Sequence, residues 1–192
     1  MSLKEFPIDK KLQEKGVFVI HKSISDYLVD ELIGKILEFS IKKPSDKIYI
    51  LFMSGGGAVK DALTLYDILK TLPNQTIGIN MGRCDSAAIA IYAGCKIRQA
   101  LPNSRFIMHA MSNSFTIKST SDEEHVLEVN REMTKEILKD FREIHEKEFN
   151  MSTETFWRLC KDGEEAKLII SASKAKDYGI VHEIVTELPL WV

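Results

Sequence analysis

Short runs of β-branched and aromatic residues alternate along this chain with segments of helical periodicity, and this alternation constrains the fold more than any other feature. Four of the runs predict buried strands, at 17–20, 47–52, 76–80 and 105–109. Helical segments separate the first three strands. A strand–helix–strand order of this kind predicts an α/β fold with parallel strands and right-handed crossovers.

The first two helices are marked by apolar residues at helical spacing. One is predicted to begin at a Ser25 cap, and the other occupies 58–72. The apolar positions are Leu28, Leu32, Ile36 and Phe39 in the first helix, and Val59, Ala62, Leu63, Tyr66 and Leu69 in the second. Further along, the pattern predicts a short helix ending near Gly163, a strand at 168–171, a helix ending at Gly179 and a terminal strand at 183–188.

A much longer helix is predicted over 121–149, with a Ser121 cap and Glu124 at the capping-box position. Its apolar stripe consists of Val126, Val129, Met133, Ile137, Phe141 and Ile144. Such a stripe packs either on the chain's own sheet or on a neighbouring subunit. The length of the helix favours the second alternative, and we therefore expect a homo-oligomer.

Composition limits the class of protein. A length of 192 residues, with 44% hydrophobic and 28% charged residues, fits one globular domain spanning 1–192. A net charge of −2 gives no basis for nucleic-acid binding. The three cysteines form no CxxC pair, which predicts reduced thiols and neither a disulfide framework nor a metal site. No secretory signal or membrane-spanning stretch is evident, so we expect a soluble cytoplasmic protein.

Two glycine turns stand between a strand and a helix. In MSGGGAVKDA, at 53–62, the glycines let the backbone approach a ligand, but the pattern of a phosphate-binding loop is absent. The turn is either a tight connection or an oxyanion hole in which the Gly57 N–H is a donor. In MGRCDSAAIAIYAG, from 81, Ser86 is either a helix cap or a nucleophile. His109, at the end of the fourth predicted strand, would be its base.

The order of these segments resembles the proteolytic subunit of Clp-type ATP-dependent serine proteases, over residues 15–187. The most specific pieces are ALPNSRFIMH, ending at His109, and KDYGIVHEIV, at 176–185. The resemblance implies a Clp/crotonase-like right-handed superhelix of ββα units, with Ser86 as nucleophile, His109 as base, and Gly57 and Ala87 as oxyanion-hole donors. It also implies stacked rings that meet through the long helix, a peptide or unfolded-protein substrate, a separate ATP-dependent unfoldase partner and no cofactor.

The sequence departs from the family's pattern at several places, which include the glycine turn at 54–57 and the residues around Ser86. The family's triad acid corresponds to Lys167, four residues before Ser171. The longer loop before it offers Asp162, Glu164 and Glu165, which we interpret as a solvated surface run rather than as replacements. The helix after Ser86 is one residue short; if the deletion precedes the serine, Asp85 takes the nucleophile's place and the site is dead. The substrate-pairing segment after His109 also differs.

The sequence therefore predicts a serine endopeptidase homologue that acts through a Ser86 acyl-enzyme and is weakened by the loss of the usual acid. One alternative is a catalytically inactive ring subunit or regulatory paralogue. Another is an acyl-CoA-handling crotonase relative, which needs no Ser/His pair.

Overall fold

A computed structural model describes residues 7–109, 123–164 and 169–188, and the side chains of 7–9, 123–127 and 162–164 are not described. In chain order the elements are α1 (Pro7–Glu14), β1 (Val17–Ile20), α2 (Asp26–Lys42), β2 (Ile48–Ser54), α3 (Val59–Thr71), β3 (Thr76–Asp85) and α4 (Ala87–Gly94). They continue with β4 (Ile97–Ala100), β5 (Arg105–Ile107), α5 (Glu123–Phe149), α6 (Thr153–Glu164), β6 (Ile170–Ser171), α7 (Ala172–Asp177) and β7 (Glu183–Ile184).

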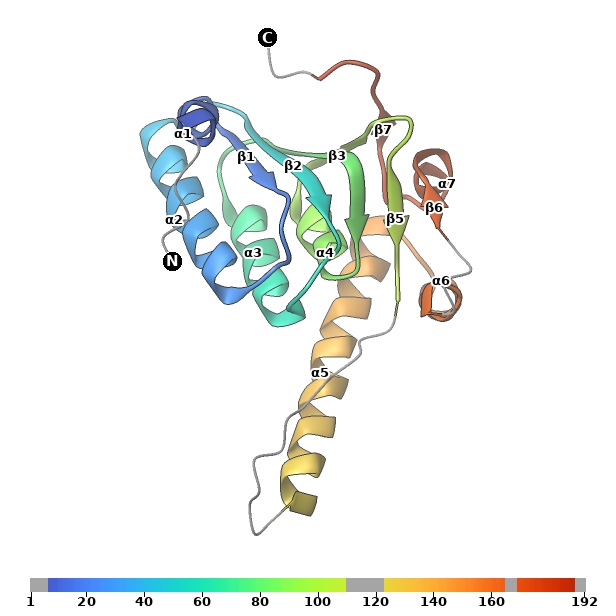
Figure 1. Cartoon of the computed structure of the whole chain (residues 1–192). Helices are drawn as coiled ribbons and strands as arrows, with labels where there is room; N and C mark the ends of the chain where they lie inside the picture. The colour runs from blue at the N-terminus through green and yellow to red at the C-terminus, as the bar shows by residue number, and fades with distance from the viewer. Residues whose placement is uncertain (1–6, 110–122, 165–168, 189–192) are drawn as a thin grey trace.

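The strands form one sheet whose main path runs β1-β2-β3-β4-β7, with every neighbouring pair parallel. Figure 1 shows α2, α3 and α4 packed along one face of this sheet. Beyond the β4 pairing, β3 continues and pairs in parallel with β5, and β6 adds to β5 in the antiparallel sense. The predicted α/β organisation with parallel strands is confirmed.

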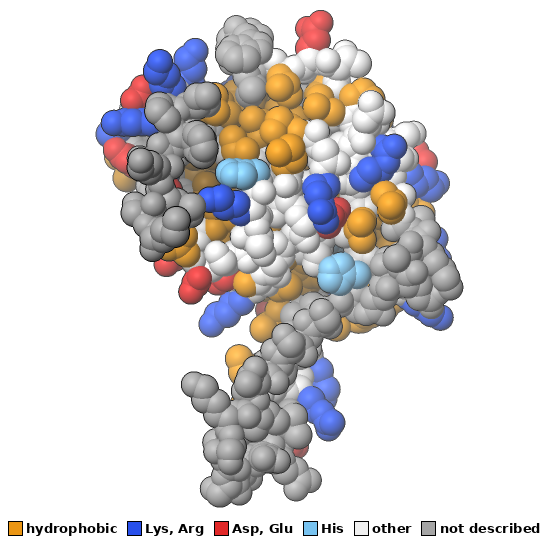
Figure 2. Space-filling model, viewed as in Figure 1, with side chains coloured by type: hydrophobic (Ala, Val, Ile, Leu, Met, Phe, Trp, Pro, Cys, Tyr) orange, Lys and Arg blue, Asp and Glu red, His pale blue; other side chains and the backbone are white. Residues whose placement is uncertain are grey.

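Alternating side chains of β2 divide between two hydrophobic clusters. Ile48, Ile50 and Phe52 lie in the main core between sheet and helices, whereas Tyr49 and Leu51 lie in a smaller cluster on the opposite face. This is the period-2 pattern of a strand that is covered on both sides. Figure 2 shows hydrophobic side chains gathered on that opposite face, over the first strands of the sheet.

Helix α2 begins as predicted, because the Ser25 Oγ accepts the Leu28 N–H at 3.4 Å. Other expectations are corrected. The third strand does not end at residue 80 but runs to Asp85, so Gly82 lies inside β3 and not in a turn. Two elements, α1 and β4, were not predicted at all. The terminal strand is only Glu183–Ile184, and the strand at 105–109 ends at Ile107.

The long helix α5 extends from the body of the molecule (Figure 1). Its apolar stripe divides into two parts. Phe141 is 3% exposed in the core, whereas Val129 and Met133 are 43% and 54% exposed. The expected Ser121 cap lies outside the described residues. The stripe therefore packs on its own domain at one end only. Among the described helices, none is long and apolar enough to cross a membrane.

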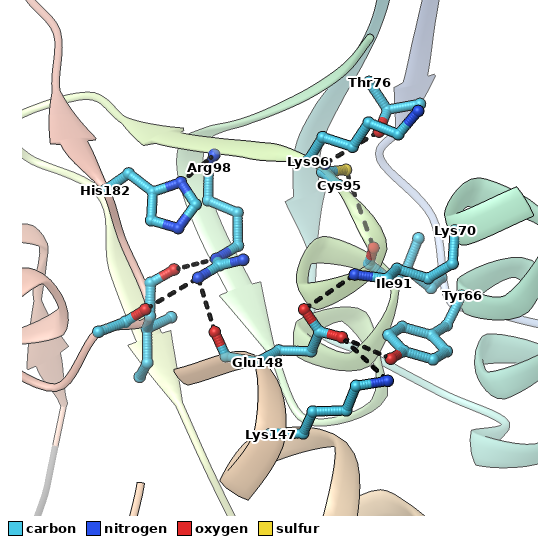
Figure 3. Close-up of polar contacts among 12 residues, drawn as sticks. Tyr66, Lys70, Thr76, Ile91, Cys95, Lys96, Arg98, Lys147, Glu148 and His182 are labelled. Atoms are coloured by element: carbon cyan, nitrogen blue, oxygen red, sulfur yellow. Dashed lines mark hydrogen bonds and ion pairs between the residues drawn. The ribbon is translucent and has the colours of Figure 1, made fainter. Parts of the chain in front are cut away.

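A polar network holds the buried end of α5 against the sheet (Figure 3). The Arg98 guanidinium, on β4, donates to the carbonyl oxygens of Ile180, Glu148 and Gly179. The Glu148 carboxylate accepts from the Tyr66 hydroxyl at 2.8 Å and from the Lys70 amine at 3.0 Å. Because these contacts satisfy a mostly buried cation and a carboxylate, α3, α5 and β4 are fixed relative to one another.

Candidate active site

Ser86 stands directly before α4, but its conformation differs from that of the serines that cap helices in this chain. Ser25 and Ser171 have extended backbones and accept a backbone N–H from the first turn of their helices. Ser86 has φ 52° and ψ −127°, and its side chain makes no cap hydrogen bond. An N-cap serine is extended and bonds the helix. The interpretation of Ser86 as an ordinary helix cap is therefore wrong.

Pairing with β5 maintains this backbone. Asp85 lies opposite Ile107 in the β3–β5 ladder, and the Ser86 N–H donates to the Ile107 carbonyl at 2.8 Å. On the other side, every residue of α4 is buried. A non-glycine residue in a sparsely populated backbone region costs of order 1–3 kcal/mol and persists only where its surroundings fix it, most often at functional sites. The result is a sharp strand-to-helix turn that carries a half-buried hydroxyl.

The glycine turn after β2 touches this serine directly. A Cβ on Gly56 would lie 2.8 Å from the Ser86 Cβ and 2.7 Å from the Asp85 carbonyl oxygen, and Gly56 has φ +92°. No other residue fits there without displacing the turn. The turn is held by Ser54, whose Oγ accepts the Gly56 N–H at 3.2 Å and donates to the Lys22 carbonyl at 2.6 Å.

Backbone N–H groups at this point are available to a ligand. Gly57 also has a positive φ, of +149°, and pairs with Ile24 through a bridge that uses the flanking Gly56 carbonyl and Ala58 N–H. Within the described parts of the chain, neither the Gly57 N–H nor the Ala87 N–H has a hydrogen-bond partner. Ala87 also opens α4, where the helix dipole is positive. Donors of this kind suit a developing oxyanion.

His109 is half-buried and lies two residues beyond the end of β5. Gly57, Ser86 and His109 thus follow β2, β3 and β5, three strands that run parallel. The carboxyl ends of parallel strands meet at one edge of a sheet, where ligands bind in open α/β folds. The candidate triad acids are not covered by the structure. Glu165 lies outside the described residues, as does Lys167 at the family's acid position, and the side chains of Asp162 and Glu164 on α6 are not described either.

Asp85 was not singled out from the sequence as a functional partner, yet it is only 3% exposed beside this turn. Its Oδ2 accepts the Arg83 Nε–H at 2.8 Å. Burial raises the pKa of the Asp85 carboxyl, while Arg83, the Ile107 N–H and the charge of His109 oppose that shift. The only sequence signal is the i, i+2 spacing of Arg83 and Asp85, which places both on one side of a strand if the segment is not a turn.

Neither a cysteine nucleophile nor a bound metal ion is supported at this site. Cys84, next to Asp85, is fully buried, and burial raises the pKa of its thiol well above the usual value. Because the thiolate is the reactive form, Cys84 is not a nucleophile here. In the part of the chain that the structure covers, no three His, Cys, Asp or Glu side chains converge in a way that would hold a metal ion.

Comparison with known proteins gives one consistent result. A family model described as Clp protease matches residues 3–188. ATP-dependent Clp protease proteolytic subunit 2 of Prochlorococcus marinus (strain NATL2A) is 26% identical over 178 residues, which are 92% of this chain and 85% of the relative. Subunit 3 of Parasynechococcus marenigrum (strain WH8102) is also 26% identical, with the same coverage.

Among solved structures, a ClpP1 mutant from Listeria monocytogenes superposes with a TM-score of 0.77 at 22% identity. The match covers 95% of this chain and 98% of that one. At this level of identity the likeness concerns the fold, and the predicted Clp/crotonase-like architecture is confirmed.

Proposed function

This chain belongs to the Clp protease family, and on that premise we propose that it is a serine peptidase in which Ser86 attacks the peptide carbonyl. One observation carries the proposal. Ser86 precedes a buried helix without capping it, in a strained backbone that touches the Gly56 turn. A structural serine gains nothing from this conformation, whereas a nucleophile needs its hydroxyl presented beside oxyanion donors.

The proposed mechanism uses four groups. His109 takes the proton from the Ser86 Oγ as that oxygen bonds to the carbonyl carbon. The carbonyl oxygen becomes an oxyanion and accepts the N–H groups of Gly57 and Ala87. The tetrahedral intermediate collapses when His109 returns the proton to the leaving amine, which leaves an ester on Ser86. Water, deprotonated by His109, then releases the acid and restores the hydroxyl.

Covalent labelling tests this assignment. A fluorophosphonate probe is expected to form one adduct, mapped to Ser86 by mass spectrometry, and to block hydrolysis of a fluorogenic peptide. Ser86→Ala is expected to lose the adduct, because no other described hydroxyl has this setting. Ser25→Ala is the matched control, since Ser25 also precedes a helix but caps it. Wild-type protein that forms no adduct, or an adduct that persists in Ser86→Ala, would refute the proposal.

We also propose that the protein works as a ring-forming homo-oligomer, with α5 in the contact between subunits. The support is the exposed part of the helix, where Val129 and Met133 continue the stripe that Phe141 buries. Peptide or unfolded-protein substrates and an ATP-dependent unfoldase partner fit the names of the relatives, which are proteolytic subunits of ATP-dependent proteases.

Sedimentation velocity is expected to show a species many times heavier than a monomer. Met133→Lys is expected to shift the distribution toward smaller species, since it places a charge on the apolar stripe. Glu136→Lys changes charge on the same helix at a side chain that is 71% exposed, and should leave assembly intact. A monomeric wild type, or equal effects of the two changes, would contradict the proposal.

A further inference from the structure

Asp85 carries a carboxylate that its surroundings satisfy only in part. It is 3% exposed, and its Oδ2 is bonded by Arg83. Its Oδ1 is buried and makes no hydrogen bond of good geometry among the described residues, although the Ile107 N–H lies near enough to act on the carboxyl. Burying a carboxylate oxygen without a hydrogen-bond donor costs folding free energy. Most buried polar oxygens in folded proteins therefore have a donor. One further N–H donor is therefore called for at this atom.

A side chain that can supply this N–H is the imidazole of His109. Asp85 pairs with Ile107 in parallel register, and His109 follows Ile107 by two residues on the same strand direction. β5 ends at Ile107. In a chain that continues extended, residues i and i+2 project to the same side, which would place His109 on the side of Asp85. The two groups are close enough for the charge of His109 to influence the Asp85 carboxyl.

Resting on the function proposed above, we infer that Asp85 is the positioning residue for His109 and fills the role of the missing triad acid. Its Oδ1 accepts one imidazole N–H, which turns the other ring nitrogen toward the Ser86 hydroxyl. Asp85 stays ionised while the proton passes between Ser86, His109 and the leaving amine. Arg83 holds Oδ2 and favours the charged form of the carboxylate. Catalytic hydrogen bonds often tighten only when substrate is bound.

This assignment makes the acids near Lys167 unnecessary for catalysis. It also explains why a buried acid stands one residue before the proposed nucleophile. The competing explanation is structural: an acid near the N-terminus of α4 stabilises the helix dipole. The two explanations differ in what they predict for turnover and for its dependence on pH.

Asp85→Asn keeps the shape of the side chain and removes its charge. We expect kcat for a fluorogenic peptide to fall at least about 1,000-fold with KM nearly unchanged, because the wrong imidazole tautomer is then favoured. Asp162→Asn, Glu164→Gln and Glu165→Gln are the matched controls and should keep kcat within about threefold. A loss of less than tenfold in Asp85→Asn, or an equal loss in one of the controls, would overturn the inference.

Arg83→Gln tests the role of Asp85 through the pH dependence of turnover, which a purely structural Asp85 would not affect. This variant also provides a test if Asp85→Asn fails to fold. The Arg83 side chain is 58% exposed, so this variant is expected to fold. Since Arg83 lowers the pKa of Asp85, its loss should move the acid limb of the kcat/KM profile upward in pH. The charged groups that act on this carboxyl are Arg83, from β3, and His109, after β5. An unmoved limb would count against the role of Asp85.

The outcomes separate this inference from the function on which it rests. If the wild type is labelled at Ser86 and turns over peptide but Asp85→Asn does too, only the inference fails. If the wild type neither labels nor turns over peptide, the proposed function fails and the role of Asp85 falls with it.

Discussion

Replacing Gly56 with alanine is expected to slow the reaction of Ser86 with a fluorophosphonate at least about 100-fold, the size of effect seen when one oxyanion donor is removed. The new Cβ would lie 2.7 Å from the Asp85 carbonyl oxygen and 2.8 Å from the Ser86 Cβ. Both distances are too short, and neither atom is the free end of a flexible side chain. The turn must shift, and with it the Gly57 N–H.

The matched control is Gly82→Ala, on the strand that leads to Ser86. Its added Cβ would meet only the Met53 Cγ, at 3.6 Å, which is ordinary contact. This variant should label at the wild-type rate. Labelling rates are measured under pseudo-first-order conditions, with circular dichroism as the check on folding. If folded Gly56→Ala labelled within threefold of the wild type, the glycine turn would not be part of the site.

The free energy of unfolding is expected to fall by about 3 kcal/mol as the pH drops from about 7 to 4, through one buried histidine. His145 is fully buried among Phe141, Phe149 and Phe156. Its Nδ1 is 2.6 Å from the Phe141 carbonyl, and its Nε2 has no partner within the described structure. Burial lowers the pKa of this imidazole from 6.5 to about 4.

The sign follows from the protonation of the two states. Between pH 6.5 and 4 the unfolded chain binds a proton at His145 and the folded chain does not, so acid favours unfolding. Above pH 6.5 both states are neutral there and the contribution is complete. Burial and the charge of Arg98 also lower the pKa of His182, so a smaller loss of the same sign comes from that side chain.

Urea unfolding at a series of pH values measures the effect. His145→Gln removes the titrating group, and the slope between pH 6.5 and 4 should shrink even if the variant is less stable overall. His21→Gln, at an exposed histidine, should leave the slope unchanged. A His145→Gln slope equal to that of the wild type would exclude His145 as the cause.

Much of the fold could be predicted from periodicity because local sequence and burial agree there. The alternation of side chains in β2 and the helical spacing from Leu32 to Phe39 in α2 predict the faces that are buried in the structure. The errors fall where pairing overrides local preference. Gly82 and Arg83 are typical of a turn, yet β5 provides a partner that keeps β3 extended to Asp85. β4 carries Arg98, whose burial depends on carbonyl groups remote in sequence.

The sequence by itself determined which chemical groups are available at the site: a hydroxyl at Ser86, an imidazole at His109 and flexible backbone at Gly56 and Gly57. Only the tertiary structure decided how Ser86 is used, because capping depends on backbone angles that β5 imposes through the Ser86 N–H. Only the tertiary structure revealed Asp85 as a buried, half-satisfied carboxylate, because burial is a property of the packed sheet and not of the residue.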